Sequence, residues 1–223
     1  MEELIRTHFS RLTMPENPKE RIKYPVPDHA ETLVVIATDI EAPYTAVSID
    51  FKFDKKEENT TQDYRRRIKR KLFSGMLKNR LVELTKASDP PFIYGTAYFN
   101  DMVLTKDGFS FFAVVNDDDI MKGIQTLLIE GQRINRFGFT KTELEREKTQ
   151  VLRQIQKAYD EMEKTESRSF VREYVSNFLR GEPIPGISSE LEMHKTFLPN
   201  ISMEEINKLS HLYMKDFNRV VAV

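Results

Sequence analysis

Residues 71–99 read KLFSGMLKNRLVELTKASDPPFIYGTAYF, and the spacing of apolar side chains changes within them. Before the turn Asp89-Pro90-Pro91-Phe92, apolar positions from Thr61 to Lys86 recur every three to five residues, which predicts a long amphipathic helix. After the turn, aromatic and β-branched residues predict a strand. This part of the chain therefore predicts a helix that leads into a sheet.

The rest of the chain predicts further strands and helices. Strands are expected at ETLVVIATDI (31–40), YTAVSIDFKF (44–53), IYGTAYFNDMVLT (93–105), GFSFFAVVN (108–116) and NRVVAV (218–223), with a hairpin turn at Asp107-Gly108. Helices are expected at 2–11, 120–136 and 140–162, and two more are expected to open at Ser189 and Ser202. This order predicts an α+β fold, an antiparallel or mixed sheet with helices packed mainly on one face.

Three capping boxes predict where helices begin. Thr140 and Glu143 form the first, and Phe139 with Leu144 fits the hydrophobic staple around it. Ser189 with Glu192 and Ser202 with Glu205 repeat the pattern. Each box is expected to open a helix, because the hydroxyl and the carboxylate satisfy backbone N–H groups that have no partner in the first turn.

Composition excludes several classes of function. The 223 residues carry 34 basic and 35 acidic side chains, so no net field attracts nucleic acid or an anionic membrane. No apolar run approaches the roughly 20 residues that span a bilayer. The chain has no cysteine, which removes disulfides, thiolate metal sites and cysteine nucleophiles. We expect no nucleic-acid partner and no membrane insertion.

Catalytic and metal-binding motifs are absent from the sequence. The histidines His8, His29, His194 and His211 are scattered, and only His194 has a carboxylate, Glu190, at helical spacing. Two ligands are too few for zinc, which takes at least three from the protein. Neither HxxEH nor HExxH occurs, and no nucleophile elbow or phosphate loop is present. We expect no catalytic, cofactor-binding or metal-binding residue in this chain.

Two surface features remain open to more than one interpretation. The basic run from Arg65 to Lys71 could face phosphates, but its side chains fan around the predicted helix, which favours a solvated helix face. The strands between Tyr94 and Phe112 are rich in aromatic residues. These could line a peptide-binding surface, although packing of one sheet face against helices is the more common use.

The segment 71–99 resembles one that recurs in pitrilysin/insulinase-family zinc peptidases, where a helix ends in Ser/Asn-Arg-Leu-x-x-x-Leu and an aromatic-containing strand follows. The matching residues are Asn79, Arg80, Leu81 and Leu84. Other stretches agree with the family's order of elements: LIRTHFSRL at the start, FTKTELEREKTQVLRQI in the middle, and ISMEEINKLSHLYMKDFNRVVAV at the end. The DPPF turn resembles that of bacterial single-chain members.

The resemblance implies a non-catalytic domain. In the family, four homologous domains form two halves around a closed chamber, and only the first bears HxxEH with a distal Glu. The fourth has an Arg and a Tyr past the Arg-Leu pattern, whereas here Thr85 stands at the place of that Arg and the turn breaks the spacing to Tyr94. The match is therefore to the second domain, and zinc is expected in the domain before it.

Residues 1–223 are accordingly expected to be one non-catalytic peptidase-like domain, a fragment of a longer chain. The implied partners are the HxxEH domain and the C-terminal half of the same chain, and a peptide substrate. Residues expected at the substrate chamber or at a domain interface are Arg80, Tyr94, Tyr98 and Phe111. An extracytoplasmic, periplasmic location follows from the resemblance. The alternative is a domain of a catalytically dead, peptidase-like scaffold or interaction protein.

Overall fold

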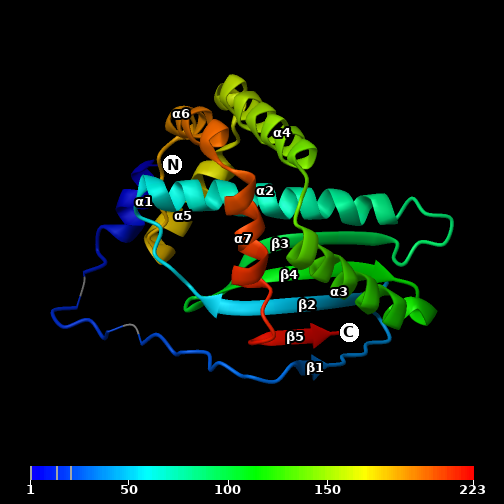
Figure 1. The fold of residues 1–223 in the computed structure, drawn as a ribbon. Helices are drawn as coiled ribbons and strands as arrows, with labels where there is room; N and C mark the ends of the chain where they lie inside the picture. The colour runs from blue at the N-terminus through cyan, green and yellow to red at the C-terminus, as the bar shows by residue number, and fades with distance from the viewer. Residues whose placement is uncertain (1, 14, 21) are drawn as a thin grey trace.

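The sheet has five strands in the order β1-β5-β2-β4-β3 (Figure 1). The computed structural model describes residues 2–13, 15–20 and 22–223. The strands are β1 (Leu33–Val35), β2 (Thr45–Asp54), β3 (Tyr94–Val103), β4 (Lys106–Val115) and β5 (Arg219–Ala222). Strand β5 pairs parallel with β1 and antiparallel with β2, and all other pairings are antiparallel. The mixed sheet of the predicted α+β fold is confirmed.

The helices are α1 (Glu2–Phe9), α2 (Thr61–Leu84), α3 (Ile120–Phe137), α4 (Lys141–Asp160), α5 (Ser167–Arg180), α6 (Ile187–Phe197) and α7 (Met203–Tyr213). Of these, α2 and α3 pack against one face of the sheet, and α7 packs on both of them. Figure 1 shows α2, α3 and α7 in front of the strands. The long helix predicted from Thr61 is confirmed as α2, and the first helix, predicted at 2–11, is α1, which ends at Phe9.

The core lies between the sheet and α2. Along β2, Val47, Ile49 and Phe51 alternate with more exposed residues, as a strand with one covered face requires. Phe109 of β4 is fully buried, and its ring centroid lies 5.5 Å from that of Phe73 on α2. Each such side chain contributes about 1.5–3 kcal/mol on burial. This packing fixes which face of the sheet is covered.

Capping boxes open α4 and α7 as predicted, with Thr140–Glu143 and Ser202–Glu205 exchanging side-chain and backbone hydrogen bonds. A third box, at Thr60–Asp63, opens α2 and was not foreseen. The box predicted at Ser189 is wrong. Helix α6 starts earlier, because Gly186 turns the chain with a φ of 77° and places Ser189 inside the first turn.

The hairpin turn also differs from the prediction. Strands β3 and β4 are joined at Leu104-Thr105, and Asp107 and Gly108 lie within β4. The glycine serves close packing instead of a turn, because a Cβ at 108 would lie 2.5 Å from Oδ1 of Asn100 on the neighbouring strand. Dipeptide preference at this site is overridden by the cross-strand neighbours.

Strand β1 is much shorter than the ten residues predicted from 31 to 40. It pairs only with β5, from Leu33 opposite Val220 to Val35 opposite Ala222. Strand β5 itself has four residues, so it offers no partner for a longer β1. The flanking residues have high β propensity but form no strand, because the neighbouring strand β5 does not extend far enough to pair with them.

Candidate functional site

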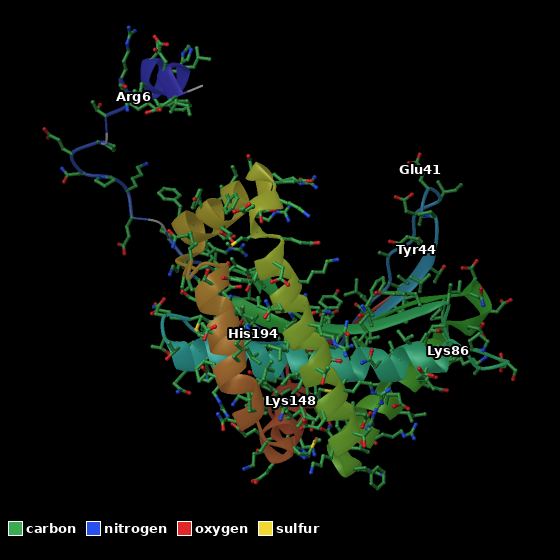
Figure 2. All side chains as sticks on the ribbon, turned by 90° about the horizontal axis from the view of Figure 1, so that it is seen from above. Arg6, Glu41, Tyr44, Lys86, Lys148 and His194 are labelled. Carbon is green, nitrogen blue, oxygen red and sulfur yellow. The ribbon has the colours of Figure 1, made fainter. Side chains whose placement is uncertain are left out.

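The side of the sheet away from α2 is the candidate functional surface, and we call it the open face. It carries Ser48, Asp50 and Lys52 from β2, Tyr94, Thr96 and Tyr98 from β3, and Ser110, Phe112 and Val114 from β4. Tyr94 and Tyr98 remain 44% and 39% exposed. Seen from above in Figure 2, α2 lies on one side of the strands, and the segment with Glu41 and Tyr44 projects to the other.

Asp50 lies in a row of side chains across the middle of the open face. Strand register places Asp50 opposite Ser110, and Ser110 opposite Tyr98. The Asp50 carboxylate accepts hydrogen bonds from the hydroxyls of Ser48, at 2.7 Å, and of Ser110. Burial raises the pKa of the Tyr98 hydroxyl, and the negative charge of Asp50 raises it further. The row therefore combines a fixed carboxylate with a half-exposed aromatic ring.

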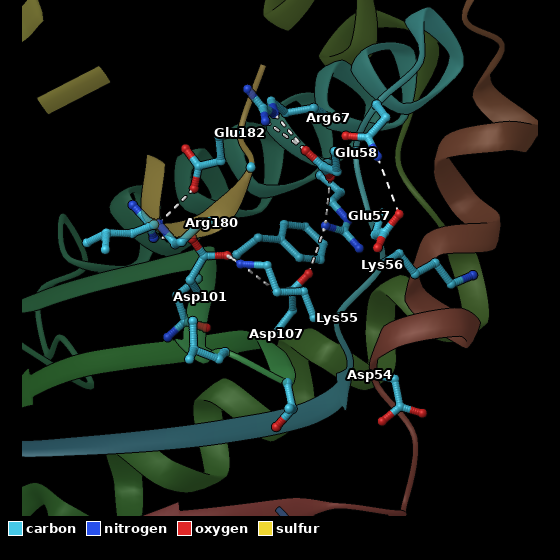
Figure 3. A pocket seen from close by; sticks show the side chains of 18 of the residues that line it. Asp54, Lys55, Lys56, Glu57, Glu58, Arg67, Asp101, Asp107, Arg180 and Glu182 are labelled. Atoms are coloured by element: carbon cyan, nitrogen blue, oxygen red, sulfur yellow. Dashed lines mark hydrogen bonds and ion pairs between the residues drawn. The ribbon is translucent and has the colours of Figure 1, made fainter. Parts of the chain in front are cut away.

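A cleft of about 900 Å³ lies between α2, α5, the loop after β2 and the end of the β3–β4 hairpin (Figure 3). Several of its charged side chains are paired with one another. Asp101 lies between Lys55 and Arg180, with oxygen–nitrogen distances of 3.0 and 2.7 Å, and Asp107 lies 3.5 Å from Arg70. Tyr98, from the open face, also lines this cleft.

Arg70 has the most enclosed guanidinium in the cleft. The Cζ atom of Arg70 lies 5.4, 5.3 and 5.1 Å from the ring centroids of Phe53, Phe99 and Tyr213. The Nε of Arg70 donates a hydrogen bond to the Tyr213 hydroxyl at 3.0 Å. Burial raises the pKa of Asp107, although the positive charge of Arg70 opposes that rise. These contacts join α2 to the sheet and to α7, so Arg70 has a role in packing.

The arginines 65–67 of the basic run on α2 form ion pairs within the domain, although Arg67 and Lys71 remain exposed. Arg65 donates two hydrogen bonds to Glu205, at 2.6 and 2.9 Å, and Arg66 pairs with Asp63 at 2.6 Å. Arg67 pairs with Glu58 at 2.8 Å. The solvated-face interpretation missed these pairs: Glu205, distant in sequence, binds Arg65, while Asp63 and Glu58, close in sequence, bind Arg66 and Arg67. The charges are therefore not presented as a phosphate-binding stripe.

The described residues hold no group of three or more His, Cys, Asp or Glu side chains arranged for a metal. His194 is buried, and its Nδ1 lies 2.8 Å from the backbone oxygen of Glu190 and 3.4 Å from the Tyr64 hydroxyl. Burial lowers the pKa of His194. The imidazole packs between α2 and α6, and these residues do not fit a zinc site.

Comparison with known proteins relates this geometry to peptidases. No family model matches the chain. A zinc protease PQQL-like protein of Arabidopsis thaliana is a homologue, 28% identical over 208 residues. The first half of the periplasmic protease PqqL from Escherichia coli superposes with a TM-score of 0.86 at 17% identity, over 99% of this chain and 47% of that one. An inactive domain of a peptidase M16 from Pseudomonas fluorescens superposes at 0.62 with 12% identity, covering 94% and 46%.

The chain has the fold of a pitrilysin-type peptidase domain. It matches 93% of its own length to the Arabidopsis thaliana homologue but spans only 19% of that protein. It likewise spans about half of the Escherichia coli fragment. In these relatives the matched region is one part of a larger peptidase. In the part of the chain that the structure describes, no helix has the length and hydrophobicity needed to cross a bilayer.

Within this pitrilysin-type domain, two of the four residues singled out in the sequence lie together on the open face, Tyr94 and Tyr98. Phe111 is 1% exposed and faces the helices, with its ring centroid 5.4 Å from that of Phe109. The alternation of β4 explains this, because Phe111 follows Ser110 and so points to the opposite face. The alternation of side chains along the predicted strand could have shown that Phe111 and Ser110 face opposite sides of the sheet.

Arg80 is engaged inside the pitrilysin-type domain. Its guanidinium donates to both carboxylate oxygens of Glu143, at 2.6 and 2.9 Å, and to the backbone oxygen of Gly138 at 3.1 Å. It also lies 4.8 Å from the Phe139 ring centroid. Arg80 thus joins the end of α2 to the start of α4. Asp50, in contrast, was not foreseen, because its partner Ser110 is 60 residues away in sequence.

Proposed function

We propose that this chain is a non-catalytic domain of a larger zinc endopeptidase, where it supports the catalytic domain and forms part of the wall of the substrate chamber. One observation carries the proposal. The fold is that of peptidase domains, and the sheet face opposite α2 leaves Tyr94 and Tyr98 half-exposed. A wall that contacts peptides through shape and side chains needs such a surface.

The exposed apolar side chains of helix α5 support the presence of a neighbouring domain. It has no buried residue, and its apolar side chains Phe170, Val171, Tyr174, Val175, Phe178 and Leu179 are all at least 43% exposed. A monomeric protein seldom exposes so many neighbouring apolar side chains, because water contact with them is unfavourable. The covering partner in this proposal is another domain of the same parent chain.

The zinc belongs to another domain in this proposal. We place this chain second in its parent, after a domain with HxxEH, and an extracytoplasmic location is supported by the periplasmic Escherichia coli relative. Among the described residues of this chain, His194 is the only histidine with a carboxylate, Glu190, one helical turn before it, and its Nδ1 faces a carbonyl oxygen instead. The chemistry of peptide hydrolysis is therefore assigned to the parent and not to these residues.

The zinc content of the 223-residue chain tests the non-catalytic assignment. After loading with zinc and dialysis, we expect less than a stoichiometric amount by metal analysis, because the residues that the structure describes hold no group of three ligands arranged for a metal. The variant His194→Ala should give the same result as the wild type. One tightly held zinc per chain that is lost in His194→Ala would contradict the proposal.

A further inference from the structure

We propose that Asp50 is a specificity residue, which binds the ammonium or guanidinium of a lysine or arginine side chain in a peptide lying against the open face. The inference rests on the proposed function, because it takes the open face to be a peptide-contacting wall. It adds the chemical class of side chain that this wall selects. The argument depends on the surroundings of Asp50 within the sheet.

The Asp50 carboxylate is held by neutral hydroxyls. Its donors among the described residues are Ser48 and Ser110, one to each carboxylate oxygen. Lys52, two residues along the same strand and on the same face, instead donates to the backbone oxygen of Pro27 at 3.3 Å. A carboxylate whose donors are hydroxyls retains lone pairs that can accept hydrogen bonds from an incoming cation.

Other acidic side chains near this sheet form ion pairs with lysine or arginine side chains of this chain. Asp54 pairs with Lys106 at 2.7 Å, and Asp101 and Asp107 have partners in Lys55, Arg70 and Arg180. Asp50 has none of these cations, although it occupies the middle of the sheet and not a loop. The Asp50 carboxylate therefore complements the positive group of a bound peptide.

Aromatic and small side chains surround the carboxylate. Tyr98 lies on β3 opposite Ser110, and Phe112 lies on β4 opposite Ser48, so both rings flank the Asp50 row. On the other side, β5 supplies only Val220 and Ala222. A lysine or arginine side chain fits these surroundings, because its aliphatic stem packs on the apolar residues while its cation meets a ring face and a carboxylate. An anionic ligand would be repelled.

Peptide binding to the full 223-residue chain tests this inference. Two fluorescein-labelled nonapeptides of glycine and serine with two leucines are compared, identical except for a central lysine or norleucine, by fluorescence polarisation at low salt. We expect the lysine peptide to bind about five- to tenfold more tightly, as a charge-assisted contact provides. In Asp50→Asn the two peptides should bind within about twofold of each other. Asp160→Asn, at the end of α4, removes the same charge elsewhere and should keep the preference.

In Asp50→Asn the amide oxygen can accept from one serine hydroxyl, and the amide NH2 can donate to the other hydroxyl once it rotates, so the urea unfolding midpoint should be kept. If it does not fold, Tyr98→Leu on the edge strand replaces it, and the lysine preference should then fall at least about twofold. Equal binding of both peptides by the wild type would overturn the inference. If Tyr98→Leu then weakens both peptides alike, the open face still contacts peptides, and only the cation preference is lost. Binding of neither peptide would also overturn the inference, while the parent's mass and zinc content decide the proposed function separately.

Discussion

Helices α4 and α5 have similar sequence patterns but very different surroundings. Both are amphipathic, yet α4 buries Leu144, Val151 and Ile155, whereas α5 buries no residue. An apolar stripe at helical spacing predicts that a face will be covered, but it does not say by which chain. For α4 the cover is this domain, and for α5 we propose that it is a neighbouring one.

The attachments of the two helices differ in the same way. Helix α4 begins at a capping box whose Glu143 also binds Arg80 of α2. Helix α5 is joined to the sheet by the ion pair of Arg180 with Asp101, at 2.7 Å, at the cleft. An exposed pair of this kind contributes little to stability. The domain is therefore well packed around α2 and α4 and weakly attached at α5.

Truncating a phenylalanine in each region gives the largest expected difference. Phe73 on α2 is fully buried, so Phe73→Ala should lower the free energy of unfolding by about 3–5 kcal/mol. Phe178 on α5 is 87% exposed, and Phe178→Ala should change it by no more than about 0.5 kcal/mol. Urea unfolding followed by circular dichroism measures both. A comparable loss in Phe178→Ala would show that α5 packs within this domain.

The start of α4 gives the next largest effect. Thr140→Ala removes the side-chain acceptor for the backbone N–H of Glu143 and should cost about 1 kcal/mol of unfolding free energy. Ser189→Ala is the matched control, because Ser189 lies inside α6 and caps nothing, and its effect should stay within about 0.5 kcal/mol. If both variants unfold at the same urea concentration, the capping box is not what holds the start of α4.

Acidification gives a smaller effect on the packed region. Hydrogen bonds from Arg65 lower the pKa of Glu205 to about 2, against an ordinary value of 4.5. Since the folded-state pKa is the lower one, this contribution is complete above roughly pH 5 and is lost as the pH falls toward 2. We expect the urea midpoint to fall over that range, and to fall less in Glu205→Gln. An unchanged slope in the variant would mean that the pair of α7 with α2 is not formed in solution.

The sequence was informative where the structure depends on neighbours along the chain. Helix α2, strand β2 and the boxes at Thr140 and Ser202 follow local spacing and were predicted. The turn after β3 was misplaced, because Gly108 is required by packing against Asn100 of the next strand. Contacts across the sheet are set by register, which local pattern does not determine.

The candidate site was predictable only in part, for the same reason. Tyr94 and Tyr98 are partly exposed, and their position at the substrate chamber or at a domain interface stays a prediction. Phe111 was grouped with them because its aromatic character was considered without its position in the alternation of β4. Asp50 gave no signal, since its surroundings come from three strands.

The length and zinc content of the protein isolated from its source organism test the central claim most directly. Intact-mass spectrometry and metal analysis of protein captured with an antibody to this domain supply both values. We predict a chain much longer than 223 residues that holds one zinc, with ligands outside this sequence and zinc content unaffected by His194→Ala. A mature protein of about this length without zinc, or a zinc that depends on His194, would contradict the account.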